Sequence, residues 1–303
     1  MWLGNIEFMG IQAPSTPRAP RVIDTWVIPN PPGVAAQWPP QLAHVLHVFG
    51  RSAMLAGQTP QQVIDEMDAA GIGRAILTGL VEDGFEVPND VVADWMAQFP
   101  DRFAGRASVD PRRPAEAVKE LERCVLELGF GSLLLLPYAF GLPFSHRLHY
   151  PLFVKCVELG IPVVTQVGHT ASLLPSEPGR PLYLDDVALD FPDLIIVGGH
   201  IGWPWTDEML AMAWKHPNVY IDASAHLPSR YPAAFVDFMR GAGADKTMFG
   251  TDYPLLALDR AVAGVLRLGL PAEAQDKFLY ANAARVFSLE ASSAGVPSVG
   301  IRA

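Results

Sequence analysis

The sequence alternates short apolar runs with longer amphipathic segments, and this alternation limits the possible folds more than any other feature. Runs such as AILTG, LLLL and LIIVGG are almost continuously apolar, which is typical of strands that are covered on both faces. Because helical patterns separate these runs, the strands are expected to be parallel. The predicted strands are Val22–Ile28, Arg74–Thr78, Phe103–Val109, Ser132–Leu136, Pro162–Val167, Leu194–Gly198, Val219–Ala223 and Thr247–Gly250.

Helix signals occupy the intervals between the strands. Thr59 followed by Pro60 is typical of an N-cap with proline in the first helical position, and Gly71 ends that helix. Pro114 begins another helix, which we expect to end at Gly129. A last helix is predicted over Glu273 to Leu289, after the eighth strand.

Eight strand–helix units in 303 residues fit one large α/β barrel. An open doubly wound sheet would more often carry a GxGxxG turn after its first strand, and this sequence has none there. We therefore predict a single (β/α)8 TIM barrel over residues 21–290, with a long loop after strand one and an extra C-terminal helix. Residues 1–20 are predicted to form an N-terminal extension, and residues 291–303 a flexible tail.

The connection after the first strand, residues 30–58, is too long for a simple loop. It is rich in proline and contains Trp38, His44 and His47. Long connections in compact domains are usually functional or carry short helices, and in a barrel this one lies at the catalytic face. We predict that Val34 to Gly57 forms a lid.

The composition limits the classes of binding partner that are expected. The chain has 22 Lys and Arg against 32 Asp and Glu, a net charge of −10, and no basic cluster that would neutralise phosphates. Nucleic acid and membrane surfaces are therefore excluded as expected partners, and a small-molecule substrate is favoured. Cys124 and Cys156 lie in apolar helical patterns without CxxC spacing, which predicts core packing. A cytoplasmic location is expected because the sequence shows no secretory signal, and a homodimer is possible.

Polar and aromatic residues gather where the predicted strands end. In a barrel, these carboxyl ends converge on one site. The strand-end residues are Asp24 to Ile28, Tyr138, Gln166 with His169 beyond it, His200, Ser224 with His226, and Asp252 with Tyr253.

Several of these segments resemble one family. The runs GIPVVTQVGHT, DLIIVGGHIGWPW and MFGTDYP, preceded by NDVVADWMAQFPDRFAGRASVDP, are similar to the amidohydrolase superfamily. The resemblance is to the branch of aminocarboxymuconate semialdehyde decarboxylase, resorcylate decarboxylase and pyrone dicarboxylate lactonase. It spans Val22 to about Phe287 and implies a TIM barrel with hydrolase or lyase activity.

The metal ligands of that family are largely replaced. Its metal-dependent members begin with aspartate-x-His-x-His, whereas this chain has Trp26 and Ile28 at the two His positions, and Gln166 replaces a ligand His on strand five. Only His200 and Asp252 match ligand positions, and a catalytic zinc site normally takes three protein ligands. We predict a metal-independent member with no cofactor, although a weak divalent metal at His200 and Asp252 remains an alternative. The resemblance implies that loss of metal need not abolish catalysis, because the lactonases work without one.

The resemblance and the residue chemistry together assign roles. Asp252, at the end of an apolar strand, is predicted to be the general acid or base, and His200 to polarise the substrate, with His169 as a second catalytic donor. Trp26 would supply a flat apolar wall for a cyclic or unsaturated substrate. The predicted substrate-binding residues are Trp26, Ile28, Tyr138, Gln166, Trp203, His226 and Tyr253. Candidates to anchor a substrate carboxylate are Arg51, Arg147, Arg180 and Arg230, among which the sequence does not choose.

The sequence is compatible with three functions. The first is a metal-independent hydrolase that opens a lactone, ester or amide in a small cyclic or unsaturated substrate. The second is a lyase, either a non-oxidative decarboxylase or a hydratase. The third is a catalytically inactive barrel that only binds a ligand. The sequence leaves the substrate itself unidentified.

Overall fold

Eight parallel strands form the barrel that the sequence predicts. A computed structural model describes residues 21–289, apart from the side chains at positions 41 and 42. The strands follow one another around the sheet in chain order, with each strand paired to the next. They are β1 (Ile23–Val27), β2 (Arg74–Thr78), β5 (Phe103–Ser108), β6 (Ser132–Leu135), β7 (Val163–Gln166), β8 (Ile196–Gly199), β9 (Val219–Asp222) and β10 (Thr247–Met248).

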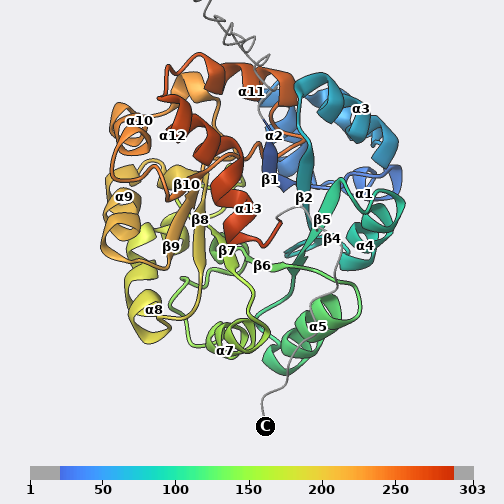
Figure 1. Cartoon of the computed structure of the whole chain (residues 1–303). Coiled ribbons are helices and arrows are strands. Elements are labelled where there is room, and N and C mark those ends of the chain that lie inside the picture. The colour runs from blue at the N-terminus through green and yellow to red at the C-terminus, as the bar shows by residue number, and fades with distance from the viewer. Residues whose placement is uncertain (1–20, 290–303) are drawn as a thin grey trace, which may run out of the picture.

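Backbone hydrogen bonds close the sheet between its first and last strands. The amide of Thr25 donates to the carbonyl oxygen of Phe249 at 3.1 Å, and the amide of Ile28 donates to that of Tyr253 at 2.8 Å. The eighth strand is shorter than predicted, and its closing contacts to β1 come instead from the segment that follows it. The predicted TIM barrel is confirmed, and Figure 1 shows its helices arranged around the strands.

The helices begin largely where the sequence signals place them. Thr59 caps α3 in a capping box with Gln62, and Gly71 ends that helix in the left-handed conformation. The helix that starts at Pro114 ends at Leu126, before Gly129. The helices are α1 (Pro32–Ala35), α2 (Pro40–Val48), α3 (Pro60–Ala70), α4 (Asn89–Gln98), α5 (Pro114–Leu126), α6 (Pro137–Phe140), α7 (Tyr150–Leu159), α8 (Leu184–Asp190), α9 (Thr206–Lys215), α10 (Ala233–Arg240), α11 (Leu258–Leu266), α12 (Ala272–Asp276) and α13 (Asn282–Val286).

Two features differ from the sequence expectations. The predicted C-terminal helix is interrupted, because the π-helical turn Lys277–Ala281 lies between α12 and α13. A two-stranded antiparallel hairpin that the sequence did not predict follows β2, formed by β3 (Leu80–Glu82) and β4 (Phe85–Val87). The residues beyond 21–289, including the predicted extension and tail, lie outside the described part of the chain.

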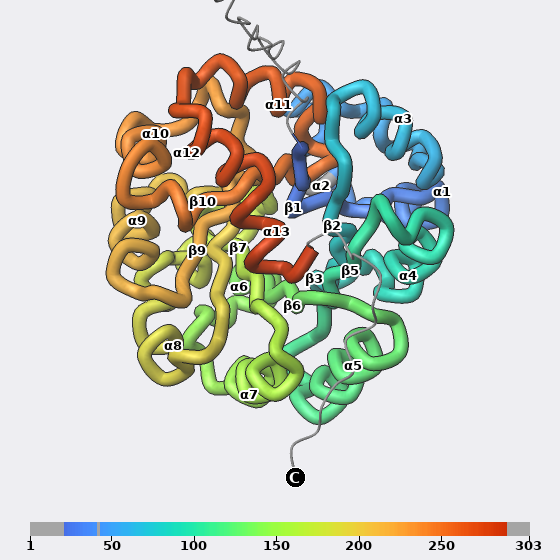
Figure 2. The backbone as a smooth tube through the Cα atoms, viewed as in Figure 1, coloured from blue at the N-terminus to red at the C-terminus, as the bar shows by residue number. Residues whose placement is uncertain are grey.

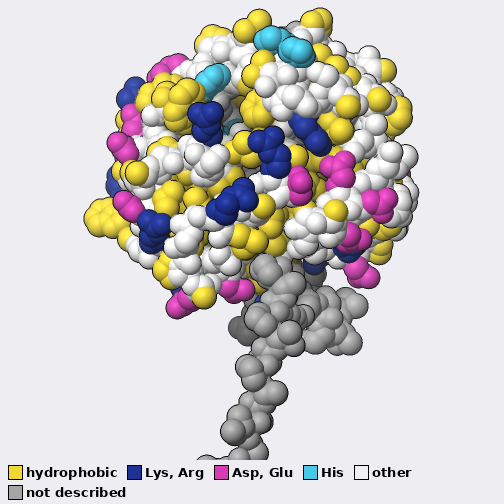
Figure 3. Space-filling view, turned by 90° about the horizontal axis from the view of Figure 1, so that it is seen from above, with side chains coloured by type: hydrophobic (Ala, Val, Ile, Leu, Met, Phe, Trp, Pro, Cys, Tyr) yellow, Lys and Arg dark blue, Asp and Glu magenta, His cyan; other side chains and the backbone are white. Residues whose placement is uncertain are grey.

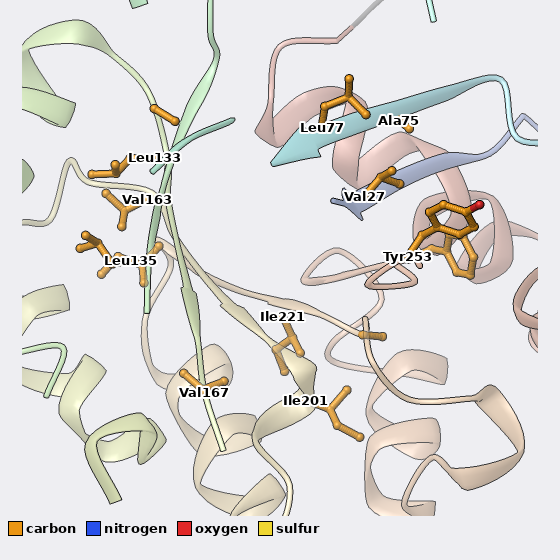
Figure 4. Close-up of a cluster of buried hydrophobic side chains, with 14 of the residues drawn as sticks. Val27, Ala75, Leu77, Leu133, Leu135, Val163, Val167, Ile201, Ile221 and Tyr253 are labelled. Atoms are coloured by element: carbon orange, nitrogen blue, oxygen red, sulfur yellow. The ribbon is translucent and has the colours of Figure 1, made fainter. Parts of the chain in front are cut away.

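The core has an outer and an inner part. The outer part packs strand side chains against the helices, and Figure 4 shows Val27, Leu77, Ile221 and Tyr253 in it. Cys124 and Cys156 are both free and buried there, as predicted. The inner part fills the barrel with residues from six of the strands, from α13 and from the position after it: Ile23, Ile76, Leu134, Val164, Val197, Met248, Ala283, Ala284, Val286 and Phe287.

The two ends of the barrel are therefore different. Figure 2 shows α13 crossing the barrel opening at the end where the strands begin. Its apolar side chains pack on the inner core and close that end. At the opposite end, where the strands stop, the long connection after β1 carries α1, α2 and a short 3-10 helix, Ser52–Ala56. Whether this connection opens and closes as a lid stays a prediction.

The outer surface is mixed in charge. On the side of the molecule seen in Figure 3, Lys and Arg side chains lie among acidic and apolar ones. Within residues 21–289, no helix combines the length and hydropathy that crossing a membrane requires.

Candidate active site

A cavity of about 750 Å³ opens at the end of the barrel where the strands stop. Its walls are mostly apolar, with a few polar groups near the strand ends, as is typical of small-molecule sites. From α2 the side chains of His44, Val45 and Val48 reach its wall. The predicted site residues that line it are Trp26, Ile28, Tyr138, Gln166, His169, His200, Trp203, His226 and Asp252.

Three of these residues meet between the ends of β1, β8 and β10. The ring centroids of Trp26 and His200 are 4.6 Å apart. His200 Nε2 lies 4.0 Å from Asp252 Oδ2, and its Nδ1 lies 2.9 Å from the Ser224 hydroxyl oxygen. When the Ser224 hydroxyl donates to Nδ1, the ring proton is on Nε2, which then faces the carboxyl of Asp252.

The backbone at these strand ends is unusual. His200 has φ +69° and Asp252 has φ +59°, and Ile201 and Ala225 also lie in the left-handed region. Side chains other than glycine rarely adopt this conformation because of steric strain. Such strain is typical of functional sites, where the surrounding structure holds a side chain in a required direction.

Asp24 holds the strained turn around Asp252. One of its carboxylate oxygens accepts hydrogen bonds from the backbone amides of Thr251, at 2.9 Å, and Trp26, at 3.1 Å. The other accepts from the Thr251 hydroxyl at 2.6 Å. The hydroxyl oxygen of Thr251 in turn accepts from the amide of Tyr253. Asp24 thus ties β1 to the residues on both sides of Asp252.

A buried arginine lies beneath the cavity. Arg106, on β5, is fully buried and donates to the carbonyl oxygen of Thr25 at 2.7 Å. Its guanidinium lies 5.1 Å from the Trp26 ring and 5.5 Å from the Phe287 ring. Burial lowers the pKa of Arg106 to about 10, opposed by the nearby Asp222 and Asp24, so it stays charged at neutral pH.

Burial also determines the charges of Asp252 and His200 at neutral pH. It raises the pKa of Asp252 to about 8, and repulsion from Asp222, Asp24 and Glu82 acts in the same direction. For His200, burial and then the nearby His226 lower the pKa to about 3. At neutral pH the site therefore holds a largely protonated carboxyl beside a neutral imidazole.

The remaining predicted residues occupy different parts of the cavity. Gln166 is buried, and its amide nitrogen donates to the carbonyl oxygens of Gly168 and His169. His169 is exposed at the rim, where its ring lies 5.5 Å from that of Trp203. His226 is half-buried, and burial lowers its pKa to about 4.

Tyr253 is a correction to the sequence prediction. It was expected to bind substrate, but its side chain is fully buried in the outer core and does not line the cavity. Its hydroxyl donates to Gln58 Oε1 at 2.5 Å and lies 2.9 Å from Glu66 Oε1. The physical reason is the turn after β10: with Asp252 in the left-handed conformation, Tyr253 forms a bridge to Val27 of β1 and its ring packs in the outer core.

The structure shows which of the four arginines proposed to anchor a substrate carboxylate lies at the cavity. Arg230 lines the cavity. Arg180 instead forms an ion pair with Glu208 at 2.7 Å, and Arg51 lies 3.6 Å from Glu66. Arg147 is exposed and does not line the cavity.

Sequence reasoning missed three polar groups near the site. Glu82 lines the cavity from the hairpin after β2, while Asp222 and Arg106 are buried below it. The position of Asp222 at the end of an apolar strand was an available signal. For Arg106, a charged residue inside the run FAGRASV was the signal, whereas nothing marked the hairpin that carries Glu82.

Fold and cavity together place the candidate site at the carboxyl ends of the barrel strands. The amidohydrolase family sequence model matches residues 44–289, and the chain belongs to this family. The chain is 25% identical over 256 residues to a γ-resorcylate decarboxylase of Rhodococcus jostii, covering 67% of this chain and 75% of that protein. It is an enzyme of the amidohydrolase superfamily.

Solved structures support the fold. An uncharacterised TIM-barrel protein from Bordetella bronchiseptica is similar with a TM-score of 0.78 and 27% identity, over 88% of this chain and 98% of that one. A 5-carboxyvanillate decarboxylase from Novosphingobium aromaticivorans, complexed with manganese and a nitrobenzoic acid, has a TM-score of 0.68 at 19% identity, over 88% and 96%. At that identity, the likeness shows the fold alone.

The residues of this chain do not fit the metal that such a relative holds. The Trp26 ring occupies the space beside β8: a Cβ added at Gly199 would lie 2.6 Å from a ring carbon of Trp26. Ile28 offers no donor atom, and the Gln166 amide nitrogen points to two carbonyl oxygens. Among the described residues, no group of three or more His, Cys, Asp or Glu side chains is placed to hold a metal ion.

Proposed function

We propose that this enzyme is a metal-independent lyase that removes carbon dioxide from a small aromatic or unsaturated carboxylic acid. The observation that carries the proposal is the buried carboxyl of Asp252 in the cavity lining, 4.0 Å from His200 Nε2, where burial raises its pKa to about 8. Similarity to a γ-resorcylate decarboxylase supports this reaction class. The hydrolase reading, which the sequence favoured, has less support.

The protonation states favour proton donation over activation of water. A hydrolase needs a base to deprotonate water or a nucleophile. With its pKa raised to about 8, Asp252 is mainly an acid at neutral pH, and with its pKa lowered to about 3, His200 is a weak base. Decarboxylation instead needs an acid, because the carbon that loses carbon dioxide must receive a proton.

The proposed reaction has two steps. First, the Asp252 carboxyl transfers its proton to the ring carbon that bears the carboxylate, and a ring π-electron pair forms the new C–H bond. Then the bond from that carbon to the carboxylate breaks, its electron pair returns to the ring, and carbon dioxide leaves. Asp252 remains as a carboxylate, facing His200 Nε2, until solvent returns its proton. The net change converts the substrate carboxylate and one proton into carbon dioxide and the ring product that carries the new C–H bond.

Other groups would bind the substrate. The Trp26 ring offers a flat face to a planar ring, and Ile28 and Leu136 extend the apolar wall. Arg230, at the cavity wall, would attract the carboxylate electrostatically. The apolar surroundings favour loss of the charged carboxylate as neutral carbon dioxide.

The test is a substrate screen with isotope labels. Phenolic and unsaturated carboxylic acids are incubated with the enzyme in D₂O, with and without a chelator, and lactones are tested in ¹⁸O-water. We expect carbon dioxide release with one deuterium on the product carbon, unchanged by the chelator. Opening of a lactone with ¹⁸O incorporation would instead establish the hydrolase. Activity that is lost on chelation and restored by manganese would overturn the metal-independent mechanism.

A further inference from the structure

A second acidic group reaches the cavity from the hairpin that follows β2. Glu82 is the last residue of β3, and it pairs with Phe85 on β4. The preceding residue is held to the barrel, because the amide of Val81 donates to the Ser108 hydroxyl oxygen at 3.1 Å. Glu82 is therefore fixed at the cavity wall by the hairpin.

In the described part of the chain, only one of the two Glu82 carboxylate oxygens has a hydrogen-bond donor. The hydroxyl of Tyr138, at the start of α6, donates to Glu82 Oε1 at 2.5 Å. Within residues 21–289, Oε2 makes neither a hydrogen bond nor an ion pair, although the side chain lines the cavity. Glu82 is half-buried, and a ligand that fills the cavity displaces water from Oε2, so a hydrogen-bond donor on the ligand compensates for the lost hydration.

The surroundings determine which kind of group that ligand can offer. Leu80, Phe85 and Leu136 also line the cavity and carry no side-chain donor, so a ligand or water is the source of a donor on that part of the wall. A ligand carboxylate would be repelled by Glu82, whereas Arg230 also lines the cavity and attracts one. The two side chains thus favour opposite groups on the same ligand.

Tyr138 acts on Glu82 as a hydrogen-bond donor. Burial and the adjacent Glu82 hold the pKa of Tyr138 well above its usual value, so its hydroxyl keeps its proton. Its hydrogen bond therefore fixes the direction of the carboxyl of Glu82 and opposes the effect of burial on the pKa of that group.

We propose that Glu82, oriented by Tyr138, is a specificity-determining residue that accepts a hydrogen bond from a donor group on the substrate other than the reacting carboxylate. Hydroxyl and amine groups share this chemistry. This inference rests on the proposed function for the identity of the reacting carboxylate. The enzyme then prefers ring acids that carry such a donor over analogues in which a methyl group replaces it.

Equilibrium binding tests the proposal without turnover. The probes are 3- and 4-hydroxybenzoate, the corresponding aminomethylbenzoates and the corresponding methylbenzoates, measured by calorimetry on the whole chain. We expect at least one donor-bearing probe to bind about tenfold more tightly than its methyl analogue, because hydrogen bonds to charged groups are the stronger ones. The hydroxyl and aminomethyl series show which donor the site prefers.

Variants assign the preference to Glu82. Glu82→Leu should abolish the difference between donor-bearing and methyl probes, and the Glu82→Leu/Tyr138→Phe double variant repeats the test without leaving the Tyr138 hydroxyl unpaired. Tyr138→Phe alone should reduce the preference, whereas a purely structural role would weaken all probes equally. Glu86→Gln is the matched control, because Glu86 is exposed on the same hairpin, and it should keep the full preference.

The outcomes separate the two proposals. Equal binding of donor-bearing and methyl probes by the wild-type chain, or an unchanged preference in Glu82→Leu, would overturn the role of Glu82. A preserved preference together with no decarboxylation of any acid would contradict the proposed function and leave the donor-binding role of Glu82 supported.

Discussion

The two ends of the barrel bury different kinds of side chain. At the end where the strands begin, Ala283 and Val286 of α13 and the following Phe287 pack on the inner core. At the other end the strands stop at groups such as His200 and Asp252, two of the residues with left-handed backbone. The first end gains stability from apolar burial, whereas the second holds buried polar groups whose desolvation is unfavourable. The difference indicates that one end stabilises the fold and the other carries the chemistry.

The largest expected effect is a loss of activity when a residue at the open end of the barrel is changed. Asp252→Asn preserves the shape of the side chain but cannot donate the carboxyl proton. We expect kcat/KM to fall by roughly 10³-fold once a substrate is found. Thermal unfolding should occur at the same or a higher temperature, because a buried ionisable group is removed. Activity within threefold of the wild type would remove Asp252 from the proton-transfer role.

At the opposite end, which α13 closes, we expect a substitution to lower stability and to leave activity nearly unchanged. Phe287 is buried against the inner core and lies near the Arg106 guanidinium. Phe287→Ala should lower the free energy of unfolding by about 3 kcal/mol, because it leaves a cavity. Chemical denaturation measures this, and kcat/KM per folded molecule should stay within about twofold of the wild type. A specific loss of activity in the folded variant would show that the closed end also shapes the site.

The pH dependence of activity tests whether Asp252 acts as a protonated acid. Because the proposed acid must carry its proton, kcat/KM should fall about tenfold per pH unit above the Asp252 pKa of about 8. His200 is already neutral above a pKa of about 3, so its titration should add no change near pH 6.5. Activity that rises with pH through 8 would indicate a base instead of an acid.

Stability should depend on pH through the same carboxyl. With a folded pKa of about 8 and an ordinary value near 3.8 when unfolded, Asp252 binds more protons in the folded state between these pH values. Its contribution is complete below the unfolded pKa and is lost as pH rises through the folded one. The stability of Asp252→Asn should therefore improve relative to the wild type between pH 5 and pH 8, as measured by urea unfolding. An identical pH dependence in both proteins would contradict the raised pKa.

The smallest effect is expected at the rim of the open end. Phe49, which follows α2, lines the cavity and is partly exposed. Phe49→Ser should raise KM several-fold with little change in kcat, because it removes apolar contact far from the reacting groups. Leu189→Ser is the control, since Leu189 is an exposed apolar residue on α8 that does not line the cavity. Equal effects of both changes would argue against α2 as part of the site.

Much of the open end was predictable from residues at strand ends. Trp26, His200 and Asp252 end apolar runs, and parallel strands in a barrel bring such ends together. Tyr253 was misplaced because it follows the left-handed turn at Asp252 beyond the end of β10, and the sequence does not show the direction of a side chain after such a turn. Glu82 was missed because its hairpin is held by contacts to β5 that are distant in sequence.

By itself, the sequence determined the barrel, its helix caps and the replacement of the family's metal ligands, because periodicity, caps and residue identity are local properties. Only the tertiary structure decided the charge states of the site and the pairing of Glu82 with Tyr138. Protonation depends on burial and on neighbours such as Asp24 and Asp222, which come from separate strands. Those neighbours meet only when the barrel closes, so no local pattern contains the information.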